Sequence, residues 1–215
     1  MTWCPALLRP AVVVFALPLL LVAGCASSSS SPAEISTVGS GGWRGTPITS
    51  AYPLPDQEFT DTSGAPFVPS GDVSTPTTLV FFGYTHCPDI CNVVLANIAA
   101  AMRGLPPSVR EQTRLLFVST DPERDTPPVV REYLDRFDPA YTGLVAPVAT
   151  VEQAASGLHI SYERPDGSTG GYEVEHGAYT TGFVDGEARV VWAEDLSVAD
   201  MRADILRLAE LARLA

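Results

Sequence analysis

Apolar and polar positions along residues 50–215 form patterns that predict strands and helices in turn. An unbroken apolar and aromatic run at 77–84 ("TTLVFFGY") is typical of a strand buried on both faces, and residues 114–120 ("RLLFVST") have the same character. Between these two runs, apolar residues recur at helical spacing until Gly104. The first half of this region therefore predicts a strand, a helix and a second strand.

The second half continues with a helix, a strand, a helix, a hairpin and a last helix. Thr126 and Pro127 are residue types of a helix N-cap and first turn, and Asp185-Gly186 joins two apolar runs as a tight turn. Ser197 begins the last helix. These elements are predicted as a helix at 126–137, a strand at 143–149, a helix at 151–159, a hairpin at 178–194 and a helix from 197 onward. A further hairpin turn is predicted at 63–64, before the first long strand.

Strands that alternate with helices predict an α/β fold with a central mixed β-sheet flanked by helices. With an N-terminal hairpin and a C-terminal hairpin plus helix, this order fits a thioredoxin-like fold. The folded domain is expected to cover residues 50–215. Folds of this kind serve many functions, so the chemistry has to be inferred from individual residues.

Residues 1–24 carry one charge, Arg9, followed by an apolar run and small residues before Cys25. This is the order of a signal peptide, and the run is shorter than the roughly 20 apolar residues of a transmembrane helix. The segment "LVAGC" is similar to a bacterial lipobox, at which the signal is removed and the cysteine receives lipid. We therefore expect a lipid anchor on Cys25 at the extracytoplasmic side of a bacterial cell membrane. An ordinary secretory signal with an incidental cysteine is the alternative.

Residues 25–49 are rich in serine and glycine and almost uncharged, which predicts a flexible tether behind the lipidated cysteine. The whole chain has a formal net charge of −12, and all 13 of its basic residues are arginine. An acidic chain without basic clusters argues against nucleic acid as a partner.

The predicted processing leaves two of the 4 cysteines in the folded domain. Cys4 leaves with the signal peptide, and Cys25 carries lipid. Cys87 and Cys91 remain, with three residues between them, whereas a thioredoxin-type motif has two. In an oxidising compartment such a pair is either a disulfide or a metal site.

Cys87 is expected where the first long strand turns into the following helix. A helix N-terminus lowers the pKa of a thiol, and helical residues four apart lie about 5–6 Å from one another at Cβ. The sulfurs of Cys87 and Cys91 can therefore face one ion or form a reversible disulfide. Thiolate sulfur is a soft ligand that selects copper(I), and imidazole is the obvious third donor.

Three histidines are available for that role. His86 should point away from its neighbour Cys87, and His159 ends an apolar helical segment as packed or capped histidines do. His176 lies in a glycine-rich stretch that can bring a side chain to a site. For His176, both a metal ligand and a solvated loop residue remain open on this reasoning.

Three segments resemble, in the same order, the motifs of the Sco/SenC family: "GYTHCPDIC" at 83–91, "VSTDPERDTP" at 118–127 and "EVEHGAY" at 173–179. Members of this family are membrane-tethered copper proteins with a thioredoxin-like fold, needed to assemble the dinuclear copper centre of cytochrome c oxidase subunit II. The resemblance covers roughly residues 50–215. It implies that Cys87, Cys91 and His176 bind the copper.

Two positions depart from the family pattern, although neither removes a ligand. Asn92 stands where the family usually has proline, and Glu175 stands where aspartate usually precedes the histidine. The longer side chain of Glu175 shifts any hydrogen bond to His176. Asp121 ends a strand beside the one that leads to Cys87, so it is a further candidate, as an oxygen donor to copper(II) or a hydrogen-bond partner of a ligand.

The other charged residues of these motifs are expected to have local roles. Glu123, Arg124 and Asp125 should be solvated or cap a helix, because loop charges mostly do so. Asp89 is expected to complement the dipole of the helix that follows it.

Two functions follow from these residues. The first is a chaperone that receives copper from an upstream donor and passes it to subunit II of the oxidase by stepwise ligand exchange. The alternative is a thiol–disulfide oxidoreductase that reduces the target's cysteines before metallation, with Cys87 attacking and Cys91 resolving. Thioredoxin-type enzymes have a proline facing the cysteine pair, but this chain has no proline after Pro165, and His176 lies in that region. This difference favours the chaperone.

Overall fold

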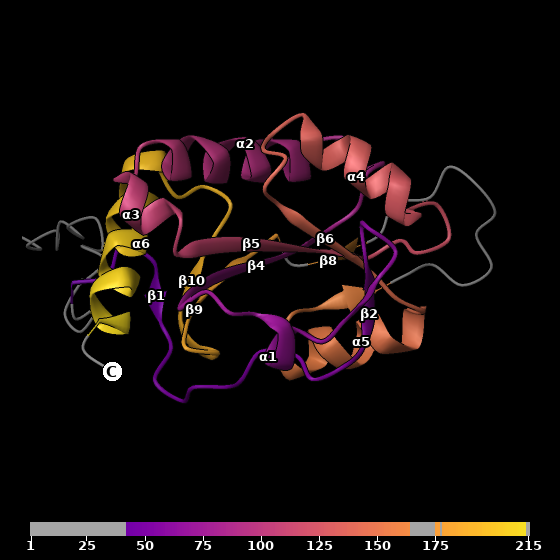
Figure 1. The fold of residues 1–215 in the computed structure, drawn as a ribbon, viewed down its shortest axis with the longest axis horizontal. Helices are drawn as coiled ribbons and strands as arrows, with labels where there is room; N and C mark the ends of the chain where they lie inside the picture. Colours follow the sequence, from indigo (N-terminus) through magenta and orange to yellow (C-terminus); the bar gives the residue numbers. More distant parts are fainter. Residues whose placement is uncertain (1–41, 164–174, 177, 214–215) are drawn as a thin grey trace, which may run out of the picture. The chain divides into compact units, whose positions relative to one another are not determined.

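The computed structural model describes residues 42–163, 175–176 and 178–213. Within these residues, one mixed sheet has the strand order β1-β10-β9-β4-β5-β6-β2-β3, and β7 pairs with β8 in a separate ribbon. Helices α2 and α4 cover one face of the sheet, and α5 covers the other (Figure 1). This arrangement confirms the predicted α/β fold with a central mixed sheet flanked by helices.

The strands are short at the edges of the sheet and long at its centre. Their bounds are β1 Thr46–Pro47, β2 Phe59–Asp61, β3 Pro66–Phe67, β4 Thr77–Gly83, β5 Thr113–Ser119, β6 Thr142–Val145, β7 Tyr162–Glu163, β8 Glu175–His176, β9 Thr180–Val184 and β10 Glu187–Trp192. The predicted hairpins are confirmed, because β2 pairs with β3 and β9 pairs with β10. Asp185 and Gly186, between β9 and β10, both have positive φ angles, as the predicted tight turn requires.

The helices follow the predicted apolar stripes. Their bounds are α1 Pro69–Asp72, α2 Ile90–Arg103, α3 Pro107–Arg110, α4 Pro127–Asp135, α5 Val148–Gly157 and α6 Val198–Ala212. Thr126 and Ser197 are the N-cap residues of α4 and α6, as predicted, and the Ser197 hydroxyl accepts a hydrogen bond from the Asp200 amide. The short helices α1 and α3 were not predicted, because four residues carry no readable periodicity.

The three central strands β4, β5 and β6 run parallel to one another. Phe81 pairs with Phe117, and Gly83 pairs with Ser119 at the carboxyl ends of their strands. Loops that leave parallel strands at their carboxyl ends meet at one edge of the sheet. The first two sequence motifs follow β4 and β5, so the fold brings them together.

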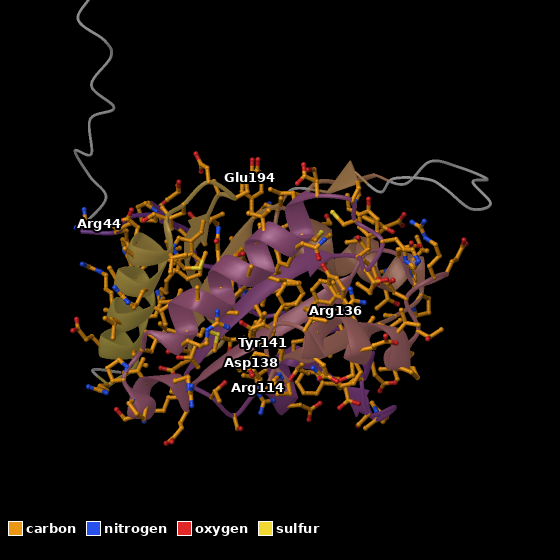
Figure 2. The ribbon with its side chains drawn as sticks, turned by 90° about the horizontal axis from the view of Figure 1, so that it is seen from above. Arg44, Arg114, Arg136, Asp138, Tyr141 and Glu194 are labelled. Carbon is orange, nitrogen blue, oxygen red and sulfur yellow. The ribbon has the colours of Figure 1, made fainter. Side chains whose placement is uncertain are left out.

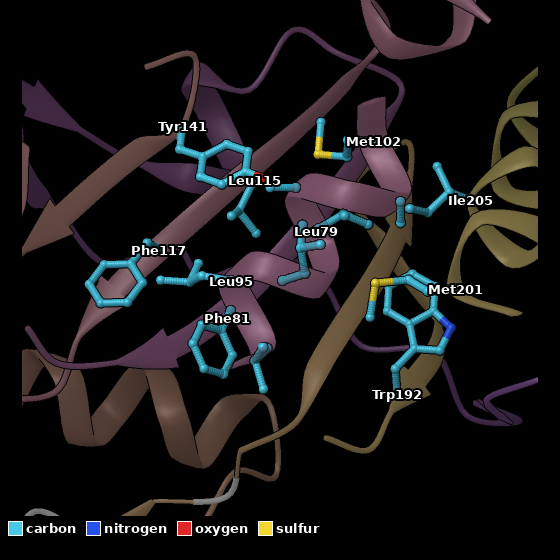
Figure 3. Packing of buried hydrophobic residues seen from close by; sticks show 14 of the residues in the cluster. Leu79, Phe81, Leu95, Met102, Leu115, Phe117, Tyr141, Trp192, Met201 and Ile205 are labelled. Carbon is cyan, nitrogen blue, oxygen red and sulfur yellow. The ribbon is translucent and has the colours of Figure 1, made fainter. Parts of the chain in front are cut away.

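The core lies on both faces of β4 and β5, whose apolar residues are almost all buried. Leu79, Phe81, Leu115 and Phe117 pack beneath α2, and Trp192 packs towards Met201 of α6 (Figure 3). Burying a side chain of this size contributes about 1.5–3 kcal/mol. The unbroken apolar runs in the sequence reflect this burial on two sides.

The folded domain begins earlier than the predicted boundary at residue 50. Strand β1 pairs with β10, and the backbone amides of Arg44 and Gly45 donate to the carboxylate of Asp204 at 2.8–3.1 Å. Figure 2 shows Arg44 beside α6. Residues 42–49 therefore belong to the domain and not to the tether, because hydrogen bonds to distant residues hold them.

The remaining N-terminal predictions concern residues outside those described. The signal peptide, Cys4, Cys25 and residues 25–41 of the tether all precede residue 42. Within the described ranges, none of the helices combines the length and the apolar character needed to cross a membrane.

Candidate metal centre

Cys87 and Cys91 lie at the carboxyl end of β4, and both are reduced and have almost no exposed surface. Cys87 precedes α2, which begins at Ile90, so the two residues do not share a helical face as the sequence predicted. A turn places them together instead, since the Cys87 amide donates to the Tyr84 carbonyl at 3.2 Å. The Cys91 amide then donates to the Cys87 sulfur at 3.4 Å. The Cys87 sulfur therefore lies over the first turn of α2.

The surroundings of Cys91 shift the pKa of its thiol. A hydrogen bond with Cys87, followed by burial, raises the pKa of Cys91 far above its ordinary value, although a backbone hydrogen bond from Tyr84 opposes the rise. The apo site thus favours a protonated Cys91, and a metal or an attacking sulfur has to displace that proton.

Gly83, the last residue of β4, makes room for the Cys91 sulfur. A Cβ atom on Gly83 would lie 3.1 Å from the Cys91 sulfur and 2.9 Å from the Phe117 ring. Any larger residue would push Cys91 away from the sheet. The glycine that opens the first motif therefore has a packing role at the site.

Asp125 contradicts its predicted role as a solvated or capping residue, because its side chain is completely buried. It accepts hydrogen bonds from the Thr85 amide at 3.0 Å, the Thr85 hydroxyl at 2.6 Å and the Ser119 hydroxyl at 2.7 Å. Burial raises the pKa of the Asp125 carboxyl, and the hydrogen bonds oppose this rise. Asp125 therefore fastens the turn before Cys87 to the end of β5. Only its position in a charged loop was visible in the sequence, and burial there carries no local signal.

Asp121 is also fully buried, and it follows β5, which ends at Ser119, and does not end the strand as the sequence predicted. Its carboxylate forms an ion pair with Arg124, and its amide donates to the Ser119 hydroxyl at 3.1 Å. Arg124 in turn lies over the ring of Tyr84, 5.8 Å from its centroid. Asp121 is thus joined to the segment between β4 and Cys87, and a role towards a metal ligand stays a prediction.

Asn92, the first departure from the family pattern, connects two helices. Its side-chain oxygen accepts a hydrogen bond from the Tyr133 hydroxyl of α4 at 3.1 Å, which a proline could not do. Tyr133 is buried, and burial first, then the charges of Cys91 and Cys87, raise the pKa of its hydroxyl. The ring of Tyr133 therefore forms part of the wall around the cysteine pair.

His176 and Glu175 form strand β8, and the description of both extends to the backbone alone. His176 pairs with Tyr162 of β7. The Tyr162 hydroxyl donates to the Thr120 carbonyl at 2.9 Å, and the Thr120 amide donates to the Gly83 carbonyl at 2.8 Å. This chain of contacts connects the His176 backbone to the end of β4 that carries the cysteines.

The other two histidines have different surroundings. His86 precedes Cys87, and 54% of its side chain is exposed. Its Nδ1 lies 3.0 Å from the Thr85 hydroxyl. His159 follows α5 with a φ of 57°, and its ring meets that of Tyr52 edge-on. The residue is nevertheless exposed, so the prediction of a packed histidine was wrong. Asp89 is the N-cap residue of α2.

In the part of the chain that the structure describes, no three His, Cys, Asp or Glu side chains are grouped closely enough to hold a metal ion. The described site offers two sulfur donors, which suit a soft ion or a disulfide. The third ligand predicted from the sequence is His176, of which the structure describes the backbone alone.

The family model described as SCO1/SenC matches residues 50–209 of the chain. A protein of Stutzerimonas stutzeri that is named as copper-binding is 30% identical over 128 residues, or 57% of this chain and 60% of that protein. The matched segments span 30% and 35% of two longer relatives. The chain thus covers less than two thirds of the curated relatives' lengths.

Solved structures agree with the fold. Apo Sco1 from Thermus thermophilus superposes with a TM-score of 0.69 at 30% identity, covering 79% of this chain and 96% of that one. ScoI from Bradyrhizobium japonicum, solved with copper bound, has a TM-score of 0.63 at 28% identity, covering 76% of this chain and 98% of that one. These matches confirm the thioredoxin-like fold.

Proposed function

Because the chain belongs to the SCO1/SenC family, we propose that it binds one copper ion through Cys87, Cys91 and His176 and delivers it to the dinuclear copper centre of cytochrome c oxidase subunit II. The observation that carries the proposal is the buried, reduced cysteine pair at the end of β4, in which the Cys91 amide donates a hydrogen bond to the Cys87 sulfur. Two sulfurs held this closely select a soft ion such as copper(I).

His176 is the third ligand in this proposal. The pairing of its backbone with Tyr162, and the bond from Tyr162 to Thr120, support a position near the cysteines. A ligand on a separate two-stranded ribbon can approach and leave without disturbing β4. Binding by three ligands leaves copper open to an incoming sulfur of the target, so that one bond forms before another breaks.

Binding of copper to Cys87 and Cys91 would release protons from their thiols. Copper(I) binds thiolates, so each thiol that becomes a ligand releases its proton to solvent. The raised pKa of Cys91 makes its proton costly to release at neutral pH. Copper affinity should therefore rise with pH.

The proposed place of action is the extracytoplasmic side of a bacterial membrane, with the domain anchored through lipid on Cys25 and supplied by an upstream copper donor. The lipobox-like "LVAGC" and the serine-rich residues 26–41 support this proposal. Mass spectrometry of membrane fractions should detect lipid on Cys25, and a mature protein without this lipid would contradict the proposed anchor.

The second candidate function is reduction of the target's cysteines. The reduced state of both cysteines and their close approach favour it. A Cys87 thiolate would attack a target disulfide and form a mixed disulfide. Cys91, as a thiolate, would then resolve it, leaving a Cys87–Cys91 disulfide and a reduced target. One pair can perform this step and copper binding at different times.

Copper(I) titration of the purified protein against a chromophoric competitor tests the first proposal. Wild type should bind one copper, and Cys87→Ser and His176→Ala should each weaken binding by at least about tenfold. His159→Ala, which removes a histidine that contacts Tyr52, is the matched control. If His176→Ala binds copper as wild type does while the cysteine pair reduces a protein disulfide, the oxidoreductase replaces the chaperone.

A further inference from the structure

We propose that His86 is the entry ligand for copper, binding the incoming ion through Nε2 before Cys87 takes it. Resting on the proposed copper function, the inference adds a step and a residue to it. Three groups carry the argument: the buried carboxylate of Asp125, the hydroxyl of Thr85 and the imidazole of His86.

Asp125 determines the direction of the hydrogen bond between Thr85 and His86. Its carboxylate accepts from three donors, namely the Thr85 amide, the Thr85 hydroxyl and the Ser119 hydroxyl. Three donors around one carboxylate satisfy its ionised form. The single hydroxyl proton of Thr85 is therefore used on Asp125, 2.6 Å away.

The Thr85 oxygen can then act towards His86 only as an acceptor. His86 Nδ1 lies 3.0 Å from it, so Nδ1 carries the proton and donates. Asp125 Oδ1 lies 3.9 Å from the same nitrogen. In a neutral imidazole with Nδ1 protonated, Nε2 has a free lone pair.

This arrangement is that of a metal-binding histidine. Such histidines almost always donate their other ring N–H to a carboxylate, a carbonyl or a water, which fixes the tautomer and raises the basicity of the ligating nitrogen. In this protein a carboxylate acts on the imidazole through a threonine hydroxyl. With 54% of its side chain exposed, His86 is open to an ion from solvent or from a partner, whereas Cys87 and Cys91 are buried.

His86 directly precedes Cys87 in the sequence, so copper bound to His86 can pass next to Cys87. Copper would exchange one bond to its donor for a bond to His86 Nε2. The Cys87 thiol would then lose its proton to solvent, and its sulfur would bind copper as the bond to Nε2 breaks. Copper keeps its charge throughout, and no electron is transferred. Since the described residues hold no preformed group of three ligating side chains, His86 is assigned to entry and not to the final ligand set.

The tautomer can be measured without copper. Two-bond ¹⁵N–¹H NMR spectra of the apo protein in mildly alkaline buffer should show the Nδ1–H form for His86. Thr85→Val should convert it to the Nε2–H form, while Thr85→Ser should keep Nδ1–H. An Nε2–H signal in the wild-type protein would overturn the proposal.

Loading kinetics test the step itself. In stopped-flow transfer from a copper(I)–competitor complex, His86→Ala should slow loading by about tenfold and leave the equilibrium affinity close to wild type. His159→Ala should load at the wild-type rate. Unchanged loading in His86→Ala overturns the entry step alone, whereas a wild-type protein that binds no copper overturns the proposed function as well.

Discussion

Two buried aspartates, Asp125 and Asp204, make the same kind of contact in two different regions of the domain. Each is almost completely inaccessible, and each accepts hydrogen bonds from three donor groups. Asp204 of α6 joins the amides of Arg44 and Gly45 to the indole of Trp192 at 2.8–3.1 Å. Asp125 joins the turn before Cys87 to the end of β5.

The difference lies in what each carboxylate connects. Asp204 closes the domain, because it ties residues 44–45 to a helix 160 positions later in the chain. Asp125 holds a turn whose side chains are partly exposed and are proposed to meet copper. Identical chemistry therefore serves stability in one region and function in the other, and only measurements on both can separate the two effects.

The largest expected effect is on stability, from Asp204→Ala. Removal of a buried carboxylate leaves the Trp192 indole and two amides without acceptors, and the free energy of unfolding should fall by about 3–5 kcal/mol. Denaturant unfolding measures this loss, with the exposed Glu210→Ala on the same helix as control. Copper stoichiometry of the folded fraction should stay at the wild-type value. A loss below that of Glu210→Ala would contradict the closing role.

Asp125→Ala should have a smaller effect on stability and a larger one on the site. Water can reach the partly exposed Thr85, so the unfolding free energy should fall by only about 1–3 kcal/mol. Copper affinity should fall by about tenfold or more, because the turn before Cys87 loses its anchor. Competitor titration and denaturant unfolding on the same sample separate the two. Equal behaviour of Asp125→Ala and Asp204→Ala in both assays would remove the distinction between the regions.

Gly83→Ala tests the packing of the site from the sheet side. The added methyl group would meet the Cys91 sulfur at 3.1 Å and the Phe117 ring at 2.9 Å. We expect a cost of about 1–3 kcal/mol and faster alkylation of Cys91, which is pushed from its buried place. At Gly71 a Cβ atom would meet nothing within 4 Å, so Gly71→Ala is the matched control. Unchanged Cys91 reactivity in a folded Gly83→Ala protein would refute the packing role.

Tyr133→Phe removes one hydrogen bond between α4 and α2. The loss of the bond to Asn92 should cost about 0.5–1.5 kcal/mol, and copper affinity should change less than in Asp125→Ala. Calorimetric unfolding checks the first value. A double variant with Asn92→Ala should cost no more than the sum of the single changes, since both remove the same contact.

The smallest effect is expected at Asp61, a surface carboxylate that also accepts three hydrogen bonds, from Ser63 and Ala65. Burial alone would raise the pKa of Asp61, but these hydrogen bonds outweigh it and lower the pKa. Its stabilisation is therefore present above the ordinary aspartate pKa and is lost as pH falls through the lowered value. Asp61→Asn should be slightly less stable than wild type at neutral pH, and thermal unfolding should show the two converging in acid.

Much of the fold was readable from local patterns. The runs at 77–84 and 114–120 predicted β4 and β5, and the turn residues Asp185-Gly186 predicted the last hairpin. Strands β1, β7 and β8 have two residues each and were not predicted, because two residues carry no periodicity. Their existence depends on partners that are distant in the sequence.

The candidate site was also only partly predictable from local patterns. Cys87 and Cys91 were found from spacing and composition, but their expected placement on one helix was wrong, since α2 begins only at Ile90. Asp125 was assigned a local role and is in fact buried against Thr85. The sequence around a charged loop residue does not show whether its carboxylate will accept hydrogen bonds from water or from a buried hydroxyl.

Residue types and spacings of a few residues were thus enough to predict the main strands and helices, the candidate cysteine pair and the family, because all three are local properties of the chain. The tertiary structure alone decided that Asp125 meets Thr85 and that Asp204 meets Arg44 and Trp192. Hydrogen bonds over 40 and 160 positions leave no trace in local periodicity. Burial fixes them, since a carboxylate removed from water has to find its donors wherever the fold places them.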